Sequence, residues 1–526
     1  MVYTNHYMNI TCKNTVNRGF RNFIIRRITV KHSFSNIRDM SSQGSGDSTL
    51  VNSIKGKLSF LSTSFKFRRG EIEILNDPSC FYNTLKQKIS NAQDRVFLAT
   101  LYIGKTEDEL ISCVGDALEN NPKLKVYFLL DGIRGTRESP SNCSAQLLAK
   151  LAKSHSDRVQ IRLYQTPSYI GWKKALIPNR FNEGLGLQHM KIYGVDDEVI
   201  LSGANLSDDY FTNRQDRYFI FKSKSFSNYY FKLHQLISSL SYKLEYSNNK
   251  QQYQLFWPKS NIAIEPIKSK RIFINQSSLA LEKLLKESYN NNIEEENSVE
   301  YPTTVYPVSQ FTPLFHKFND KSTEKKSILN MISSISSPSI NWVFTTGYFN
   351  MLPDIRKKLL ATPSQKSTVI TASPYANGFY ESKGVSSHLP AAYLHLSKKF
   401  LKAVKRNGKE NNIQLREWKR GIVNKPDGWS YHAKGLWILG NDNGESLPFA
   451  TVIGSSNYTK RAYSLDLETN AVILTTDIEL KKQLNHELEN LLGNTEAVSL
   501  KDFKSDPNRK VSIGVKVATT VLGTKL

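Results

Sequence analysis

The chain has 526 residues, which is long enough for two or three domains, each with its own core. Its formal charge of +24 favours an anionic partner such as nucleic acid, an acidic membrane surface or a phosphorylated substrate. Four widely spaced cysteines without a C-x2-C pair argue against a zinc site or a disulfide framework. The absence of an apolar window of about 18 residues argues against a membrane-spanning helix.

The first 38 residues have the composition of a targeting segment. They contain seven Lys or Arg and no acidic residue before Asp39, and apolar side chains such as Phe20 and Ile24 lie among the arginines. This pattern is typical of a mitochondrial transit peptide, although a basic arm that binds nucleic acid or lipid has a similar composition. Its removal would leave a charge of 24 − 7 = +17. The Ser- and Gly-rich stretch that follows predicts a linker over residues 39–69.

Residues 70–250 alternate segments of helical and strand periodicity. Phe81, Leu85 and Ile89 are spaced as on one face of a helix. Further predicted helices cover residues 107–120, 144–154 and 227–246, and predicted strands cover residues 95–103, 125–132 and 159–164. Strands that alternate with helices indicate a layered α/β domain.

The chemistry of this half is concentrated between His189 and Asp216. His189, Lys191 and Asp196 have the spacing H-x-K-x4-D. A Gly-Ala-Asn turn with Asn205 follows, and Asp216 lies eleven residues beyond it. Residues two apart in a strand point to the same face, so the imidazole and the ammonium can approach one substrate atom. A histidine beside a cation suits phosphodiester chemistry, because the imidazole can act as nucleophile or proton carrier while the lysine neutralises phosphate oxygens.

Residues 307–500 repeat this organisation after an irregular connection over residues 251–306, which carries the acidic stretch 290–300. Tyr102 lies 87 residues before the first H-x-K histidine, and Tyr348 lies 84 residues before the second, with elements in the same order between them. Residues 501–526 form a C-terminal tail whose apolar run predicts either a terminal strand or a membrane-surface anchor.

The second copy keeps most of the motif. His432 and Lys434 repeat the H-x-K pair, and Glu468 lies eleven residues beyond Asn457. The position that matches the acidic residue of the first motif is Leu439. One H-x-K pair is weak evidence, but two copies with a matching Asn and a matching acidic residue predict a functional site.

A weaker pattern, ATLYIGKT from Ala99 to Thr106, fits a loose phosphate-binding loop. Such a loop needs a turn that exposes its backbone between strand and helix, whereas the first five residues here are predicted as strand. The equivalent stretch of the second copy, TTGYFN, lacks the Gly-Lys pair. We therefore expect no ATP binding and no other cofactor. The histidines outside the two motifs lack metal-ligand spacing, so no metal site is predicted.

The paired motifs resemble those of the phospholipase D superfamily. Within it, the runs GLQHMKIYGVDDEVILSGANLSDDYFTNRQDRY (from Gly186), HAKGLWIL and IGSSNYTKRAYSLDLETN are similar to the eukaryotic family of mitochondrial phosphatidylglycerophosphate synthases. The resemblance covers residues 70–500 in layout and is specific at both motifs. Leu439 departs from the full superfamily motif, which puts the equivalence of the two halves in doubt.

This resemblance implies an α/β fold of two tandem phospholipase D-like α/β/α halves, packed about a pseudo-twofold axis with one shared active site. It implies transfer of the phosphatidyl group from CDP-diacylglycerol to glycerol 3-phosphate, with release of CMP, through a phosphohistidine and without a metal. It also implies peripheral action on an anionic membrane, on the matrix side of the mitochondrial inner membrane, and no nucleic-acid partner.

The lysines and asparagines of the two motifs are expected to serve the phosphate. Lys191 and Lys434 should each contact phosphate oxygens and cancel charge in a water-poor cleft. Asn205 and Asn457 could donate hydrogen bonds to the same oxygens.

The histidines and acidic residues are expected to divide the proton transfers. Asp216 and Glu468 could each hold an imidazole Nδ1–H, so that Nε2 faces phosphorus. His189 is assigned as the nucleophile because its motif is complete, and His432 as the acid/base, with the reverse assignment left open. Asp196 is either catalytic or a residue that organises the loop after its strand.

Other functions fit parts of the pattern. A nuclease or phosphodiesterase of the same superfamily would also use a basic surface, but such enzymes typically lack the acidic residue in both motifs. A non-catalytic module that binds acidic lipid or nucleic acid would not need both H-x-K pairs. Cardiolipin synthase and phosphatidylserine synthase are nearer alternatives, which only the residues flanking the motifs separate from the main interpretation.

Overall fold

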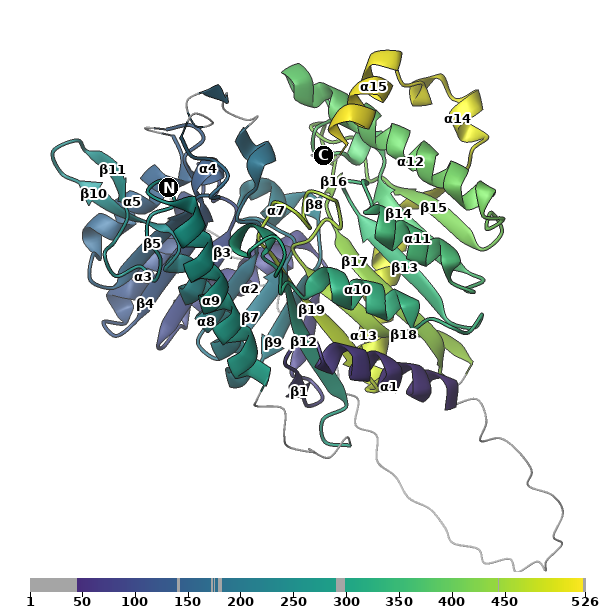
Figure 1. Ribbon diagram of the computed structural model, residues 1–526, viewed down its shortest axis with the longest axis horizontal. Coiled ribbons are helices and arrows are strands. Elements are labelled where there is room, and N and C mark those ends of the chain that lie inside the picture. Colours follow the sequence, from purple (N-terminus) through teal and green to yellow (C-terminus); the bar gives the residue numbers. More distant parts are fainter. Residues whose placement is uncertain are drawn as a thin grey trace, which may run out of the picture. The chain divides into compact units, whose positions relative to one another are not determined.

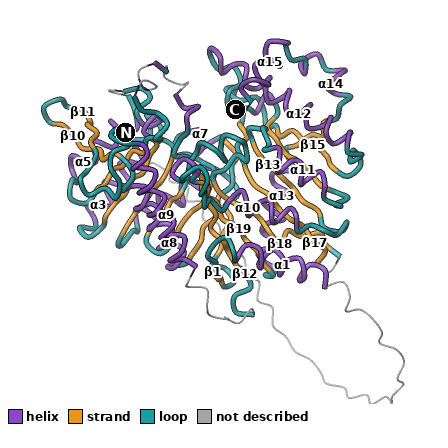
Figure 2. The backbone as a smooth tube through the Cα atoms, in the orientation of Figure 1, coloured by secondary structure: helices purple, strands orange, loops and turns teal. Residues whose placement is uncertain are grey.

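The computed structural model describes residues 45–523, apart from 140–141, 172–173, 175, 178–181, 290–298 and 443. The described chain is one compact unit built from two α/β halves, each with a large mixed sheet and helices packed on it (Figures 1 and 2). The predicted transit peptide lies outside the described residues, as does most of the acidic stretch 290–300. Within the part of the chain that is described, no helix has the length and apolar character needed to cross a membrane.

The sheet of the first half consists of β2 (Ile72–Leu75), β3 (Arg95–Thr100), β4 (Lys125–Asp131), β5 (Val159–Tyr164), β6 (Ile192–Val195), β7 (Glu198–Ser202), β9 (Tyr218–Lys222), β10 (Tyr242–Ser247) and β11 (Gln252–Phe256). Their order in the sheet is β11-β10-β5-β4-β3-β6-β7-β9-β2. β3, β4 and β5 are parallel, so their carboxyl ends meet at one edge, where α/β proteins place their ligands.

Helices pack on this sheet, and the local sequence explains where α2 begins and which face α3 buries. They are α2 (Pro78–Ser90), α3 (Asp108–Asn120), α4 (Gly132–Gly135), α5 (Ser144–Ser154), η1 (Asn182–Leu185), α7 (Asp208–Thr212), α8 (Lys224–Ser238) and α9 (Lys270–Tyr289). α2 begins at Pro78, whose fixed φ suits the first helical position, and the Asp77 side chain accepts a hydrogen bond from the first turn. α3 buries Leu110, Val114 and Leu118, which are spaced four apart on one face.

The sheet of the second half consists of β1 (Phe65–Phe67), β12 (Thr303–Gln310), β13 (Asn341–Thr346), β14 (Ser367–Ala372), β15 (Ile413–Trp418), β17 (Lys434–Asp442), β18 (Glu445–Gly454), β19 (Glu468–Thr475) and β20 (Thr495–Val498). Their order is β1-β12-β19-β18-β17-β13-β14-β15-β20. The run β15-β14-β13-β17-β18-β19 matches β5-β4-β3-β6-β7-β9 of the first half. This match confirms the predicted internal repeat.

The helices of the second half are α1 (Ser45–Ser59), η2 (Thr312–Leu314), α10 (Glu324–Ser333), α11 (Pro353–Ala361), η3 (Pro374–Ala376), η4 (Gly384–His388), α12 (Leu389–Arg406), α13 (Ile478–Leu492), α14 (Asp502–Ser505), η5 (Pro507–Arg509) and α15 (Ile513–Leu522). α12, α14 and α15 gather at the upper right of Figure 1. α12 buries residues such as Leu394, Leu401 and Val404 against the sheet and leaves lysines outside.

The two halves are joined at the segments that carry the motifs. A two-stranded parallel ladder pairs β8 (Arg214–Gln215) of the first half with β16 (Ser430–Tyr431) of the second. An isolated bridge pairs Gln188 with Leu467 at the equivalent place. One hydrophobic cluster contains Phe219 from the first half and Ile473 from the second, so the halves share a core.

Four sequence expectations differ from the structure. Part of the predicted linker 39–69 is folded, because α1 buries Leu50, Ile54 and Leu58 in the core of the second half and β1 extends its sheet. The predicted helix 227–246 ends at Ser238, and β10 follows, because the alternation of Tyr242, Leu244 and Tyr246 suits a strand between two neighbours. The connection 251–306, predicted as irregular, contains the long helix α9. The C-terminal tail forms the short helices α14 and α15, which excludes the terminal strand but not the membrane-surface anchor.

A buried arginine holds the halves together below the site. Arg217 of the first half is 1% exposed and forms a two-point ion pair with Glu487 on α13, at 2.7 and 2.9 Å. Its guanidinium also lies 3.9 Å from the ring centroid of Trp437 and donates to Val452 O at 2.6 Å. A paired and fully hydrogen-bonded charge of this kind fixes one relative position of its elements.

Candidate active site

The two H-x-K segments lie at equivalent edges of the two sheets. His189 lies three positions before the first residue of β6, and His432 lies two positions before the first residue of β17. Backbone hydrogen bonds hold both against the opposite half, from His189 N to Leu467 O at 2.9 Å and from His432 N to Gln215 O at 2.8 Å. The tertiary structure therefore brings the two histidines to the joint between the halves.

Each imidazole is held by the acidic residue of the other half. His189 Nδ1 lies 2.9 and 3.1 Å from the two carboxylate oxygens of Glu468. His432 Nδ1 lies 2.6 Å from Asp216 Oδ2. Both carboxylates are almost fully buried. A carboxylate that accepts Nδ1–H fixes the tautomer in which Nε2 carries a lone pair, so these contacts orient both rings for chemistry at Nε2.

Burial sets the protonation of these groups. Burial, followed by the positive charge of Lys191, lowers the pKa of His189 well below 6.5, and burial does the same for His432. Burial raises the pKa of Asp216, and it raises the pKa of Glu468 to about 7 although the nearby Lys191 opposes the change. Both imidazoles are therefore neutral near pH 7, which is the form that can attack phosphorus or accept a proton.

The two motif lysines are buried beside the histidines. Lys191 Nζ donates to His189 O at 2.7 Å, and Lys434 Nζ donates to His432 O at 2.8 Å. Burial lowers the pKa of both ammonium groups, so an anionic substrate would supply the charge that keeps them protonated. A side chain at Gly203 would lie 2.6 Å from Lys434 Nζ, so only glycine leaves room for this ammonium.

The two motif asparagines lie beside the histidines, with one departure from expectation. Asn205 Nδ2 donates to the Tyr210 hydroxyl at 3.0 Å, and that hydroxyl lies 3.3 Å from His432 Nε2. The amide predicted to donate to phosphate is thus already paired within the protein. In the described chain, Oδ1 of Asn205 and Oδ1 of Asn457 are both buried without a hydrogen-bond partner. The two copies thus bury the same unpaired asparagine oxygen.

Asp196 lies apart from this group, and the structure corrects its catalytic assignment. It sits in the β6–β7 turn with φ +50, at the end of β6 away from His189. Its carboxylate accepts hydrogen bonds from the backbone amides of Gln93, Asp94 and Arg95 at 2.8 to 3.0 Å. The carboxylate therefore caps the start of β3. The matching sequence position of the second copy, Leu439, lies within β17 and not in a turn, and its apolar side chain can accept no hydrogen bond.

We expect Asp196→Ala to destabilise the fold and spare the chemistry. Loss of an acceptor for three amides should lower the free energy of unfolding by about 1–3 kcal/mol. The kcat of the folded variant should stay within about threefold of the parent, since nothing in the catalytic group is touched. Thermal unfolding and kcat of the purified variant check this, with the exposed neighbour change Asp197→Ala as the control. A 100-fold loss of kcat without loss of stability would return Asp196 to the catalytic group.

Aromatic and basic side chains border the histidines. The ring of Tyr348 packs edge-on against His432 at 5.4 Å between centroids and stacks on Tyr393 of α12 at 5.6 Å. Arg214 lies over the ring of Tyr210 at 4.4 Å and forms an ion pair with a neighbouring aspartate. These residues supply a further cation and a rigid apolar border to the cleft.

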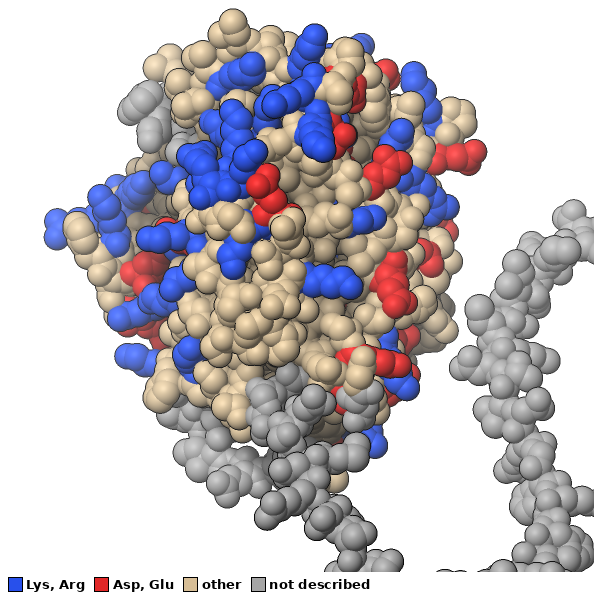
Figure 3. Space-filling view, turned by 90° about the vertical axis from the view of Figure 1, so that its right-hand side faces the viewer, with Lys and Arg blue, Asp and Glu red and all other residues tan. Residues whose placement is uncertain are grey.

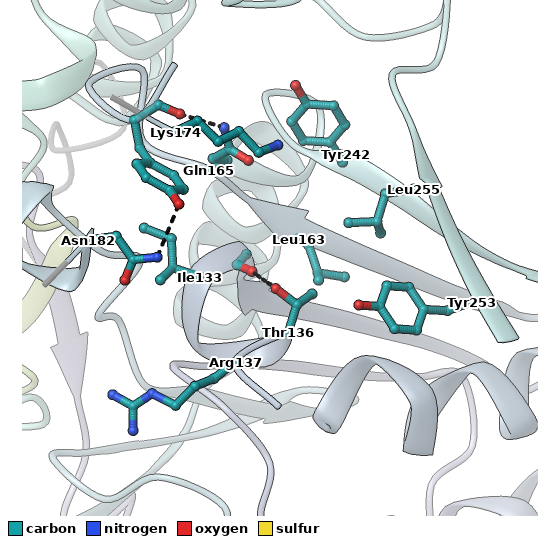
Figure 4. A pocket seen from close by; sticks show the side chains of 12 residues that line it. Ile133, Thr136, Arg137, Leu163, Gln165, Lys174, Asn182, Tyr242, Tyr253 and Leu255 are labelled. Atoms are coloured by element: carbon teal, nitrogen blue, oxygen red, sulfur yellow. Dashed lines mark hydrogen bonds between the residues drawn. The ribbon is translucent and has the colours of Figure 1, made fainter. Parts of the chain in front are cut away.

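A cavity of about 260 Å³ opens at the same edge of the first sheet, beside α4 (Figure 4). Figure 4 shows the Asn182 amide donating to the Tyr169 hydroxyl, and Gln165 and Lys174 nearby. Asp131 links this region to the motif, because its carboxylate accepts hydrogen bonds from the first amides of α4 and from Gln188 N. The Asp131 carboxylate thus connects α4, which lines the cavity, with the backbone of the residue before His189.

Several named proteins are similar to this chain in sequence over most of their length. CDP-diacylglycerol–glycerol-3-phosphate 3-phosphatidyltransferase of Saccharomyces cerevisiae is 61% identical over 470 residues, covering 89% of this chain and 90% of that protein. The chain belongs to this phosphatidyltransferase family. The Schizosaccharomyces pombe member is 39% identical and covers 87% of this chain and 94% of that protein. The human member, named as mitochondrial, is 33% identical, with coverage of 88% and 84%.

Two further comparisons concern the fold of the chain. The family model described as "Cardiolipin synthase, PLD-like domain" matches residues 85–236, which contain the first motif. The crystal structure of phosphatidylserine synthase from Haemophilus influenzae superposes with a TM-score of 0.65 at 19% identity, covering 90% of this chain and 97% of that one. The predicted two-half phospholipase D-like fold is therefore confirmed.

Sequence analysis missed part of the site of this phosphatidyltransferase. Tyr210 and Arg214 lie inside the run that carried the resemblance. Neither stands out in the sequence, because only the pairing of β8 with β16 brings this segment against the second half. Tyr348 was used only to compare the distance to the H-x-K histidine in the two copies. Ser455, whose hydroxyl donates to Glu468, was named only as part of the second Gly-Ser-Ser-Asn turn.

The loose phosphate-binding-loop pattern has a packing explanation in this family member. Gly104 N donates to Leu206 O at 2.7 Å, in the segment before α7. A side chain on Gly104 would lie within 3.0 Å of Glu107 and Ser207, which explains a glycine at this position. The backbone amide is therefore engaged within the protein. That the chain binds no ATP stays a prediction.

Proposed function

We propose that this enzyme transfers the phosphatidyl group from CDP-diacylglycerol to sn-glycerol 3-phosphate through a phosphohistidine on His189. The observation that carries the proposal is the pair of cross-half contacts, His189 with Glu468 and His432 with Asp216, beside two buried lysines. Two oriented neutral imidazoles and two cations are the groups that a two-step displacement at phosphorus needs.

The first step is attack by Nε2 of His189 on the phosphorus that bears the diacylglycerol. A nitrogen–phosphorus bond forms, the bond to the CMP oxygen breaks, and CMP leaves with that electron pair. His189 is favoured over His432 because Nε2 of His432 lies 3.3 Å from the Tyr210 hydroxyl, whereas Nε2 of His189 has no hydrogen-bond partner among the described residues. The His189 side chain is also the more exposed of the two, 12% against 4%.

The second step uses His432 as a general base. Its Nε2 accepts the proton of the 1-hydroxyl of glycerol 3-phosphate, the oxygen attacks phosphorus, and Nε2 of His189 leaves with its electron pair. The product is phosphatidylglycerophosphate, and both imidazoles return to the neutral form once the proton passes to solvent. CMP is an acidic leaving group, so proton transfer matters most in this second step.

We expect kcat/KM to rise with pH and to reach a plateau above about pH 7. Below pH 7 the Glu468 carboxyl, whose pKa is raised to about 7 by burial, takes up a proton and no longer accepts Nδ1–H of His189. The histidines do not cause this limb, since their pKa values lie well below it. Glu468→Gln should flatten the limb at a lower plateau. A limb that persists unchanged in Glu468→Gln would contradict the assignment.

We also propose that the enzyme works at an anionic membrane surface in the mitochondrion, on the matrix side of the inner membrane. Support comes from the acid-free basic residues 1–38, from the charge of 24 − 7 = +17 on the remainder, and from the name of the human relative. A fluorescent protein fused after residues 1–44 should accumulate inside mitochondria, and cytosolic fluorescence would contradict the proposal.

A direct assay separates this function from its nearest alternatives. Purified full-length protein is supplied with CDP-diacylglycerol in vesicles and with labelled glycerol 3-phosphate, serine or phosphatidylglycerol. We expect one CMP released for each label that enters lipid, and only with glycerol 3-phosphate. Transfer to serine would indicate a phosphatidylserine synthase, and transfer to phosphatidylglycerol a cardiolipin synthase. Either result would overturn the proposal.

A further inference from the structure

The C-terminal helix α15 presents an apolar stripe to solvent. Ile513, Val517 and Val521 are 78%, 58% and 71% exposed, and their spacing of four places them on one face. The helix instead buries Thr519, at 4% exposure. A surface helix normally turns its apolar face inward, so this reversed orientation needs a partner outside the described chain.

Beside α15 lies a cavity of about 260 Å³ with a basic lining. It is lined by Leu394, His395, Lys398, Phe503, Arg509, Lys510, Val511 and Lys516. Arg509 is neutralised by an ion pair with Glu417 at 2.7 and 2.8 Å. The lysines are not neutralised in this way, because among the described residues no carboxylate lies within ion-pair distance of Lys398, Lys510 or Lys516. Figure 3 shows Lys and Arg side chains gathered over the upper part of this face.

The position of α15 ties this surface to the active site. Asn350 Nδ2 donates to Gly523 O, at the end of α15, at 2.6 Å. Asn350 lies two residues after Tyr348, and the ring of Tyr348 packs on His432. On the other side, Lys399 of α12 donates to Thr520 at 3.4 Å, and α12 also carries Tyr393, which stacks on Tyr348. Through Asn350 and α12, α15 is therefore connected to the aromatic side chains that border His432.

We propose that α15 and the basic cavity dock the enzyme on an anionic phospholipid bilayer, with the apolar stripe in the acyl boundary and lipid phosphates at Lys398, Lys510 and Lys516. An interfacial helix with apolar residues on one side and lysines beside it has the chemistry of a membrane-surface anchor. A second copy of this chain fits poorly, because a symmetric contact would bring the same unpaired lysines together. The inference rests on the proposed function only because that function names a lipid substrate. Docking through α15 would turn the active site toward the bilayer that contains this lipid.

Vesicle binding without substrate tests the docking surface independently of catalysis. Full-length protein is sedimented with phosphatidylcholine vesicles containing either no or about one third phosphatidylglycerol. The stripe variant I513S/V517S/V521S should bind acidic vesicles at least about tenfold more weakly, since it removes the inserted apolar area. The lysine variant K398Q/K510Q/K516Q should lose roughly fivefold per lysine and most of its salt dependence. The control Leu279→Ser, on an exposed apolar residue of α9, should bind and turn over as the parent does.

Activity gives the second readout. We expect the ratio of turnover on vesicles to turnover on a dispersed short-chain CDP-diacylglycerol to fall at least about tenfold in the stripe variant. Parent-like vesicle binding by both variants would overturn the proposal. So would a concentration-dependent dimer of the parent that the stripe variant abolishes while vesicle binding is kept, because a second copy would then cover α15. Failure of the parent to transfer phosphatidyl groups while it still binds acidic vesicles would reject the proposed function and leave the docking surface standing.

Discussion

Replacing His189 by alanine should reduce phosphatidyl transfer by at least about 10⁴-fold, because it removes the nitrogen that we propose forms the covalent intermediate. The loss should appear in the first half-reaction, both as lost release of CMP and as lost labelling of the protein. The measurement uses CDP-diacylglycerol with ³²P in its phosphatidyl phosphate, followed by denaturation and a search for acid-labile, base-stable label. The parent should carry such label and His189→Ala should not.

His432→Ala provides the contrast. It should still become labelled, since the first step needs no strong acid for a leaving group such as CMP, and the label should persist because the second step lacks its base. His316→Ala, at an exposed histidine away from the site, is the control for general effects of losing an imidazole. Label that survives in His189→Ala and disappears in His432→Ala would exchange the two roles.

The cross-half carboxylates predict a second large effect with a distinctive pattern. Glu468→Gln should slow the first step by about 10³–10⁴-fold, because Glu468 orients His189 although it lies in the other half. Asp216→Asn should leave the initial burst of CMP and slow the second step by a similar factor, because Asp216 orients His432. Rapid-mixing measurement of CMP release, with and without glycerol 3-phosphate, separates the two steps.

The alternative pairing, in which each carboxylate serves the histidine of its own half, predicts the opposite assignment of the two defects. Observation of that reversed pattern would contradict the geometry described above. Glu489→Gln, an exposed carboxylate on α13, is a suitable control and should leave both steps near parent values. Unfolding curves for all three variants distinguish slow chemistry from loss of folded protein.

Much of the site could be predicted from local pattern. The H-x-K pairs, the trailing asparagines and the acidic residues eleven positions later recur in both copies, and a strand brings residues two apart to one face regardless of distant contacts. Most helix and strand positions near the motifs followed from periodicity in the same way. The helix over 144–154 and the strand over 159–164 agree with the structure at both ends. At β10 the alternation of Tyr242, Leu244 and Tyr246 fits a strand, but the choice of strand over helix also depends on the pairing with β5 and β11, which are distant partners.

The sequence by itself determined which residue types form the site, that two copies exist, and which family the chain resembles. Only the tertiary structure decided how they are combined. His189 meets Glu468 across 279 positions and His432 meets Asp216 across 216, because the interface between the halves, and not chain proximity, brings strand ends together. The same is true of Asp196, which shares a motif with His189 but caps β3 because its turn lies at the other end of β6. Spacing along one chain does not specify which end of a strand, or which neighbouring half, a side chain will serve.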